Sequence, residues 1–95
     1  MKKELIKIPR ATFDFYKYEE NGLTYYEFDA TNSHPPEPMI NAIYAFTLLK
    51  SENVRIVGIF LQEPFPLYER IPLTIAHEVE ELDNGDFRVT FKLEE

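Results

Sequence analysis

Residues 54–61 read VRIVGIFL, and Arg55 is the only charged side chain among them. A continuous apolar run of this length is typical of a strand that is buried on both faces, as in parallel sheets. Parallel neighbours need a crossover connection, which is usually a helix. Residues 38–49, PMINAIYAFTLL, carry no charge and predict that helix. With residues 24–30 as the first strand, the sequence predicts a right-handed βαβ unit.

Further strands are expected on both sides of this unit. Residues 23–30 alternate between polar and apolar side chains and follow the turn sequence EENG, while DNGD at 83–86 is a strong hairpin turn. The other predicted elements are a strand over 12–18, a proline-bounded loop with one or two helical turns over 62–72, and strands over 73–82 and 87–93. We therefore expect an α+β fold, a two-layer sandwich in which two helices cover one face of a mixed sheet of four or five strands.

The predicted helix has two faces that differ little in polarity. On a helical projection one half holds the larger apolar side chains, namely Met39, Ile40, Ala42, Ile43, Phe46 and Leu49. The other half, which we expect to face outward, holds Asn41, Tyr44, Ala45 and Leu48. An outer face without charge, beside a central strand that is apolar on both sides, indicates a covered surface. The sequence therefore predicts a homodimer or a partner protein, with Tyr44 and Leu48 as interface residues.

Composition excludes several classes of function. The chain has 95 residues, enough for one domain, and a net charge of −7, so it lacks the basic stripe of a nucleic-acid binder and is repelled by acidic membranes. It contains no cysteine, which removes disulfides, thiolate catalysis and zinc–thiolate sites. No signal-peptide pattern and no apolar run long enough for a membrane span is visible. We expect a soluble, cytoplasmic, acidic protein.

Two proline-rich stretches, FDATNSHPPEPM at 28–39 and FLQEPFPLYERI at 60–71, carry a resemblance. Together they resemble a small bacterial domain-of-unknown-function family marked by a PPEP…HEPxPLY pattern. That family is similar to the TusA/SirA-like sulfur-carrier fold, with the order β-α-β-α-β-β. The resemblance covers residues 24–93 of the single domain and implies that residues 1–23 are an N-terminal extension with an extra strand.

The sequence departs from this pattern at two places. Sulfur carriers of this fold have a Cys-Pro-x-Pro at the start of the helix, where this chain has Pro35-Pro36-Glu37-Pro38. Because no cysteine is present anywhere, persulfide transfer is excluded. The second motif has Gln62 where the family has a histidine, which removes that ligand from the position.

Polar residues follow both strands of the predicted βαβ unit. The carboxyl ends of parallel strands meet at one edge of a sheet, where open α/β sheets bind ligands. The residues expected at that edge are Asp29, Asn32, His34, Glu37, Gln62, Glu63 and Tyr68. Of these, His34, Glu37, Gln62, Glu63 and Tyr68 are the predicted ligand-binding residues. The alternative is ordinary loop polarity, in which Asp29 and Asn32 hold turns and Glu37 complements the helix N-terminus.

No catalytic constellation, cofactor motif or metal motif is evident in the sequence. His77 and Glu81 would share a face only on a helix, and their segment predicts a strand. We therefore expect a non-enzymatic interaction or small-ligand-binding module without a cofactor. The alternative is a small metal-binding or enzymatic protein that uses the strand-end crevice around His34 and Glu63.

Overall fold

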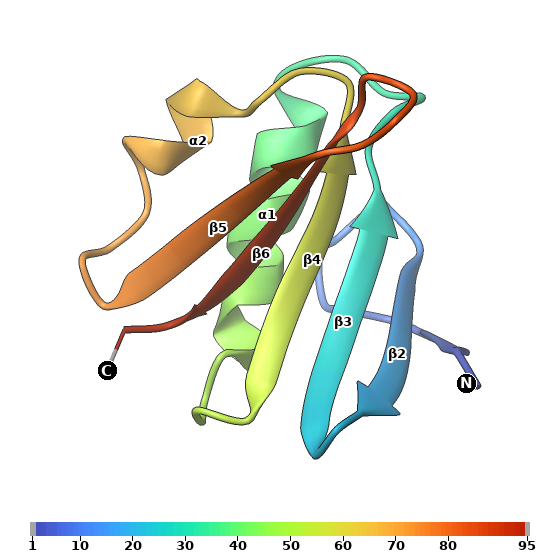
Figure 1. Ribbon diagram of the computed structural model, residues 1–95, viewed down its shortest axis with the longest axis vertical. Coiled ribbons are helices and arrows are strands. Elements are labelled where there is room, and N and C mark those ends of the chain that lie inside the picture. The colour runs from blue at the N-terminus through green and yellow to red at the C-terminus, as the bar shows by residue number, and fades with distance from the viewer. Residues whose placement is uncertain (1, 95) are drawn as a thin grey trace.

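The computed structural model describes residues 2–94 and shows an α+β fold (Figure 1). A six-stranded sheet is accompanied by two helices. The strands are β1 (Glu4–Ile6), β2 (Phe15–Glu20), β3 (Leu23–Asp29), β4 (Val54–Phe60), β5 (Ile75–Glu81) and β6 (Phe87–Leu93). The helices are α1 (Glu37–Ala45), which continues as a 3₁₀ turn over Phe46–Leu48, and the short α2 (Phe65–Tyr68). Among the described residues, no helix has the length and apolarity needed to cross a membrane.

The strands lie in the order β1-β2-β3-β4-β6-β5. β3 and β4 are parallel and are connected through α1, which confirms the predicted βαβ unit, and the other neighbours are antiparallel. The expected count of four or five strands was wrong, because β1 adds a sixth strand at the edge. β1 has only three residues and pairs Leu5 with Tyr16 of β2, so its existence depends on a neighbour that is distant in sequence.

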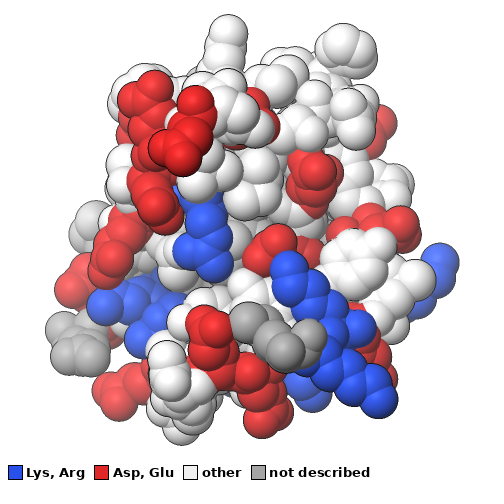
Figure 2. All heavy atoms as spheres, turned by 45° about the vertical axis from the view of Figure 1, so that its right-hand side comes forward, with Lys and Arg blue, Asp and Glu red and all other residues white. Residues whose placement is uncertain are grey.

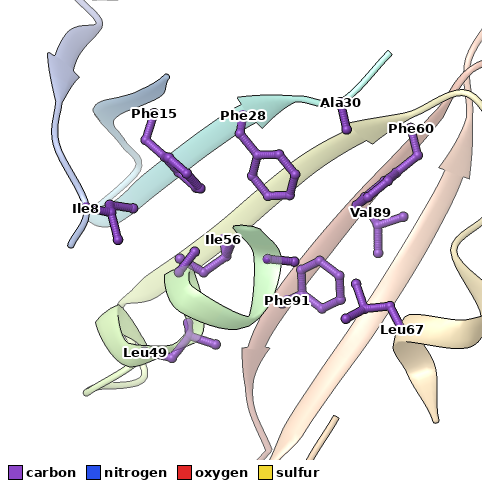
Figure 3. Close-up of a cluster of buried hydrophobic side chains, with 12 residues drawn as sticks. Ile8, Phe15, Phe28, Ala30, Leu49, Ile56, Phe60, Leu67, Val89 and Phe91 are labelled. Atoms are coloured by element: carbon purple, nitrogen blue, oxygen red, sulfur yellow. The ribbon is translucent and has the colours of Figure 1, made fainter. Parts of the chain in front are cut away.

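Both helices pack against the same face of the sheet, as expected, and the core lies between the two layers (Figure 3). Phe15, Phe28 and Phe91 are fully or almost fully buried there. Phe28 packs at right angles to Phe60, with ring centroids 5.7 Å apart. Gly58 of β4 leaves room for these rings, since a Cβ at this position would lie 2.6 Å from Phe60 and 2.7 Å from Phe28. Residues before and after position 23 therefore share one core.

The predicted inner and outer faces of α1 were wrong in part, although Ala42 and Leu49 are buried as expected. Asn41, Ala42 and Ala45 are buried, whereas Ile40 and Ile43 are 38% and 39% exposed. Small alanines on the buried side let the helix approach the sheet closely, and this contact outweighs the preference of isoleucine for the interior. The predicted interface residues Tyr44 and Leu48 are half-buried and pack against the core.

Asn41 is buried because it binds the backbone of the segment that precedes β2. Its Oδ1 accepts hydrogen bonds from the N–H groups of Thr12 at 2.8 Å and Phe13 at 2.9 Å. Its Nδ2 donates to Thr12 Oγ1 at 3.1 Å and to the Glu37 carbonyl at 2.9 Å. The side-chain amide is thus satisfied on both its oxygen and its nitrogen, which makes its burial tolerable.

The second face of the sheet is not covered by a helix, but its centre is nonetheless buried. Val57 is fully buried, and Tyr18 of β2 is only 5% exposed. The Tyr18 and Tyr25 rings stack with centroids 5.0 Å apart, and the Tyr18 hydroxyl donates to Glu27 Oε1 at 2.8 Å. Lys3 lies 4.9 Å from the centre of the Tyr18 ring and 3.6 Å from Glu27 Oε2. Val57 is therefore buried by the chain itself, without a partner chain.

Candidate functional site

A pocket of about 370 Å³ opens at the carboxyl ends of β3 and β4. The two strands remain parallel up to their ends, where the Ala30 N–H donates to the Ile59 carbonyl at 2.8 Å. The pocket is lined by Ala30, Ser33, His34, Pro35, Pro38, Met39, Phe60, Leu61, Gln62, Glu63, Pro64, Pro66 and Leu67. Figure 2 shows that this upper end of the molecule consists mainly of uncharged residues, whereas acidic and basic side chains gather lower down and on the left. The site is therefore mainly apolar, with a few polar groups.

The first wall of the pocket is the loop between β3 and α1. Asp29 Oδ1 accepts from the Thr31 N–H at 2.8 Å and from the Thr31 hydroxyl at 2.6 Å, which fixes the chain as it leaves the strand. The Ser33 hydroxyl then donates to the Ala30 carbonyl at 3.0 Å. The Glu37 N–H donates to the His34 carbonyl at 3.0 Å, where the chain turns into α1. These bonds place Ser33 and His34 at the pocket.

The second wall is the segment between β4 and α2. The Tyr68 hydroxyl donates to Glu63 Oε2 at 3.2 Å, and its ring stacks on His77 of β5 with centroids 3.8 Å apart. Leu67 is 1% exposed and anchors α2 in the core. Burial, followed by the negative charge and hydrogen bond of Glu63, raises the pKa of Tyr68 well above its ordinary value. Tyr68 therefore stays a neutral donor that orients Glu63.

The structure brings together most, but not all, of the predicted binding residues. His34, Gln62 and Glu63 line the pocket, and Tyr68 lies behind Glu63. Glu37 is not among the lining residues; its Oε2 accepts from the Thr12 hydroxyl at 3.2 Å.

Two residues expected at the same edge have other positions. Asp29 holds the turn at Thr31, which is the alternative role that the sequence allowed for it. Asn32 is exposed and does not line the pocket. The prediction from sequence was therefore better for the position of the pocket, at the carboxyl ends of β3 and β4, than for the side chains that line it.

Sequence reasoning missed the apolar lining. Met39 comes from the first turns of α1, and Leu67 comes from α2. The sequence did contain a signal for these two residues. Both belong to the proline-rich stretches that follow β3 and β4, so they were expected near the ends of these strands. The predicted binding residues are all polar, although ligand pockets are lined mainly by apolar side chains.

Within residues 2–94, no group of three or more histidine, aspartate or glutamate side chains is placed to hold a metal ion. His77, whose segment was predicted to be a strand, does lie in β5. The His77 ring stacks on the ring of Tyr68.

Comparisons with known proteins add little to this picture. No family model matches the sequence, and no curated protein matches it. A solved structure described as "Crystal structure of humanized D. rerio TDP2 by 14 mutations" aligns with 97% of this chain at 11% sequence identity and a TM-score of 0.43. This chain covers 64% of the length of that one. Likeness at this level supports no conclusion about fold or activity.

Proposed function

We propose that this protein is a non-enzymatic binding module whose strand-end pocket holds a small ligand with an apolar body. The observation that carries the proposal is the pocket itself, in which apolar walls from two loops enclose a few convergent polar groups. Its volume of about 370 Å³ lies in the range of small-molecule sites. Its position beyond the carboxyl ends of parallel strands is the usual location for ligands in open α/β sheets.

The polar groups favour a hydrogen-bond donor, preferably a cation, as the head group of the ligand. Glu63 uses Oε2 to accept from Tyr68, and no cationic side chain within residues 2–94 pairs with it. Its Oε1 is therefore available as a charged acceptor inside an apolar wall, where charge-assisted hydrogen bonds are strong. The net charge of −7 also favours the approach of cations over anions.

The proposal is tested with three ligands that share one ring and differ in head group: benzylamine, benzyl alcohol and benzoate. In a ¹H–¹⁵N NMR titration we expect shifts at Met39, Glu63 and Leu67, with affinity falling from the amine to the alcohol to the acid. Shifts elsewhere, or none with any of the three, would contradict the proposal.

Substitution of Glu63 separates the head group from the apolar body. Glu63→Gln should weaken benzylamine binding to the level of benzyl alcohol and leave the alcohol unchanged. Glu69→Gln is the matched control, because Glu69 is exposed, follows α2 and lies outside the pocket. Equal loss in both variants would show that only net charge matters.

The fold supports a further, separate expectation. From β3 to β6 the elements follow one another as β, α, β, α, β, β, which agrees with the sulfur-carrier-like order implied by the sequence resemblance. We propose that the chain has this type of fold and does not carry sulfur, since Pro35 stands where the carriers have their cysteine. Incubation with a cysteine desulfurase and labelled cysteine should leave the chain unlabelled.

Self-association also remains a proposal. The exposure of the side chains on α1 now favours a different part of the helix as the interface. The exposed side of α1 carries Ile40 and Ile43, with Thr47 following in the 3₁₀ turn, and the only charged residue of the helix, Glu37, lies at its first position. Two copies can therefore meet through the apolar middle of this surface. A two-fold axis would place this same surface on both sides of the contact. We therefore propose a homodimer through Ile40 and Ile43 in place of Tyr44 and Leu48.

A further inference from the structure

β5 forms one border of the sheet and has a free edge (Figure 1). All seven of its residues pair with β6, from Ile75 opposite Leu93 to Glu81 opposite Phe87, and no other strand of the described residues pairs with it. Residues 77–81 are exposed. Every second N–H and C=O along β5 therefore points away from the sheet, where a further strand can bind.

The two edges of the sheet differ in how well they can receive a strand. β1, at the opposite border, is three residues long. β5 is more than twice as long, and contains no proline or glycine and no break in its pairing. Proteins usually protect exposed edges with short strands, prolines, bulges or charges. Of these protections β5 has only charge.

The charged residues of β5, namely Glu78, Glu80 and Glu81, are all acidic, and Val79 separates the first two. Glu78 and Glu80 lie on the open face, opposite Thr90 and Arg88, while Val79 lies on the helix face opposite Val89. Val79 is 43% exposed. Glu78 pairs weakly with Lys92 at 3.7 Å, and its side chain is still 76% exposed. The edge thus presents two carboxylates on the open face, and on the helix face it presents Val79 between His77 and Glu81.

We propose that the free edge of β5 binds an extended segment of a partner protein in which lysine or arginine alternates with apolar residues. Basic residues would face Glu78 and Glu80, and an apolar residue would contact Val79. Opposite charges on neighbouring strands stabilise a sheet, whereas like charges directly opposite destabilise it. Pairing of β5 with a second copy of itself would set glutamates against glutamates, so charge complementarity selects a basic partner.

This surface is separate from the strand-end pocket. None of the β5 residues lines that pocket. The inference therefore stands or falls independently of the proposed ligand.

The test uses a short peptide, acetylated and amidated, in which lysine and valine alternate. Two matched peptides are compared with it, one with glutamate for lysine and one with the same composition but all lysines together. We expect the alternating lysine peptide to bind about tenfold more tightly than the glutamate peptide, and to slow amide hydrogen exchange along β5. Raised salt should reduce the difference.

Charge on the protein is then removed at matched sites. Glu78→Gln with Glu80→Gln should abolish the preference for the lysine peptide. The control, Glu19→Gln with Glu20→Gln, removes the same charge from exposed positions on β2 and should keep the preference. The proposal would be overturned if no peptide bound, or if binding left β5 unprotected from exchange. It would also be overturned if the alternating lysine peptide and the peptide with all lysines together bound equally, or if both double variants had the same effect. So would protection of β5 that grows with protein concentration when no peptide is present.

Discussion

The two faces of the sheet are buried by different means. On the helix face, aromatic rings from several strands pack together, with Phe15 5.0 Å from Phe28, and α1 covers them. On the open face, Val57 is equally buried although no helix covers it, and the side chains on this face include the stacked Tyr18 and Tyr25. The apolar sequence of a strand therefore predicts that both of its faces are buried, but not whether a helix, a partner or other side chains bury them.

The difference has an energetic consequence. Close-packed aromatic residues contribute through apolar area and shape, so truncation leaves a cavity. The tyrosine cover of the open face contributes through stacking, one hydrogen bond and nearby charges, all closer to water. Substitutions on the helix face should therefore destabilise the protein more than substitutions on the open face.

The largest effect is expected from the helix face. Phe28 is 1% exposed and contacts the rings of both Phe15 and Phe60. Phe28→Ala should lower the free energy of unfolding by about 3–5 kcal/mol. Urea denaturation measures this loss, and Tyr25→Ala on the same strand is the matched open-face variant. A larger loss from Tyr25→Ala would reverse the comparison.

A somewhat smaller loss of stability is expected at Asn41, on the buried side of α1. Asn41→Leu keeps the branched shape of the side chain but leaves the N–H groups of Thr12 and Phe13 without their buried acceptor. A buried group that is left unsatisfied costs about 1–3 kcal/mol. Because Thr12 is exposed and Phe13 is half-buried, water can replace part of what is lost, and the total loss should stay within about this range. Thermal unfolding should show a clear fall in Tm, and amide exchange at residues 12 and 13 should become faster. Unchanged exchange there would contradict this role of Asn41.

On the open face, Tyr18→Phe should cost only about 1 kcal/mol, because it removes one hydrogen bond and keeps the ring. The loss should also depend on pH. Burial, and then the hydrogen bond and charge of Glu27, raise the pKa of Tyr18 from 10.0 to about 12. The folded protein holds this proton more tightly than the unfolded chain, so the stabilisation is complete below pH 10 and is lost as pH rises toward 12.

The difference in stability between the wild type and Tyr18→Phe should therefore shrink between those two pH values. Urea denaturation of both proteins at several alkaline pH values measures it. Taking the difference removes the contributions that other tyrosines and lysines make in the same range. A difference that is constant or grows with pH would show that Tyr18 is not the titrating group.

The smallest effect on stability is expected at the outer side of α1. Ile43→Lys replaces an exposed side chain and should change the free energy of unfolding by no more than about 0.5 kcal/mol. Its effect should appear in the mass measured by light scattering instead. We expect the wild type at about twice the monomer mass of 11.2 kDa and the variant at the monomer mass. A monomeric wild type would refute the dimer.

Regular patterns predicted the fold well where neighbours in sequence determine the structure. The hairpin turns and the apolar run of β4 gave the strands, and the uncharged segment before β4 gave α1. β1 was missed because its three residues carry no pattern and pair only after β2 is in place. The face of α1 was assigned wrongly because hydrophobicity ranks Ile43 above Asn41, whereas the backbone of Thr12 and Phe13 decides which side chain is buried.

The candidate site was predictable in place but not in composition. The parallel pair β3 and β4 determines where the two proline-rich loops meet, and this follows from the sequence. Which side chains enter the pocket depends on how each loop turns. Asp29 is diverted to Thr31, and Glu37 is diverted to Thr12, through hydrogen bonds that no periodicity shows.

The hydrogen bonds of Asn41 also constrain the order in which the chain acquires its structure. They join residues that are 28 and 29 positions apart, so the segment before β2 cannot dock until α1 has formed. Closure of such long loops slows folding. The residues just before β2 should therefore gain these contacts late in folding.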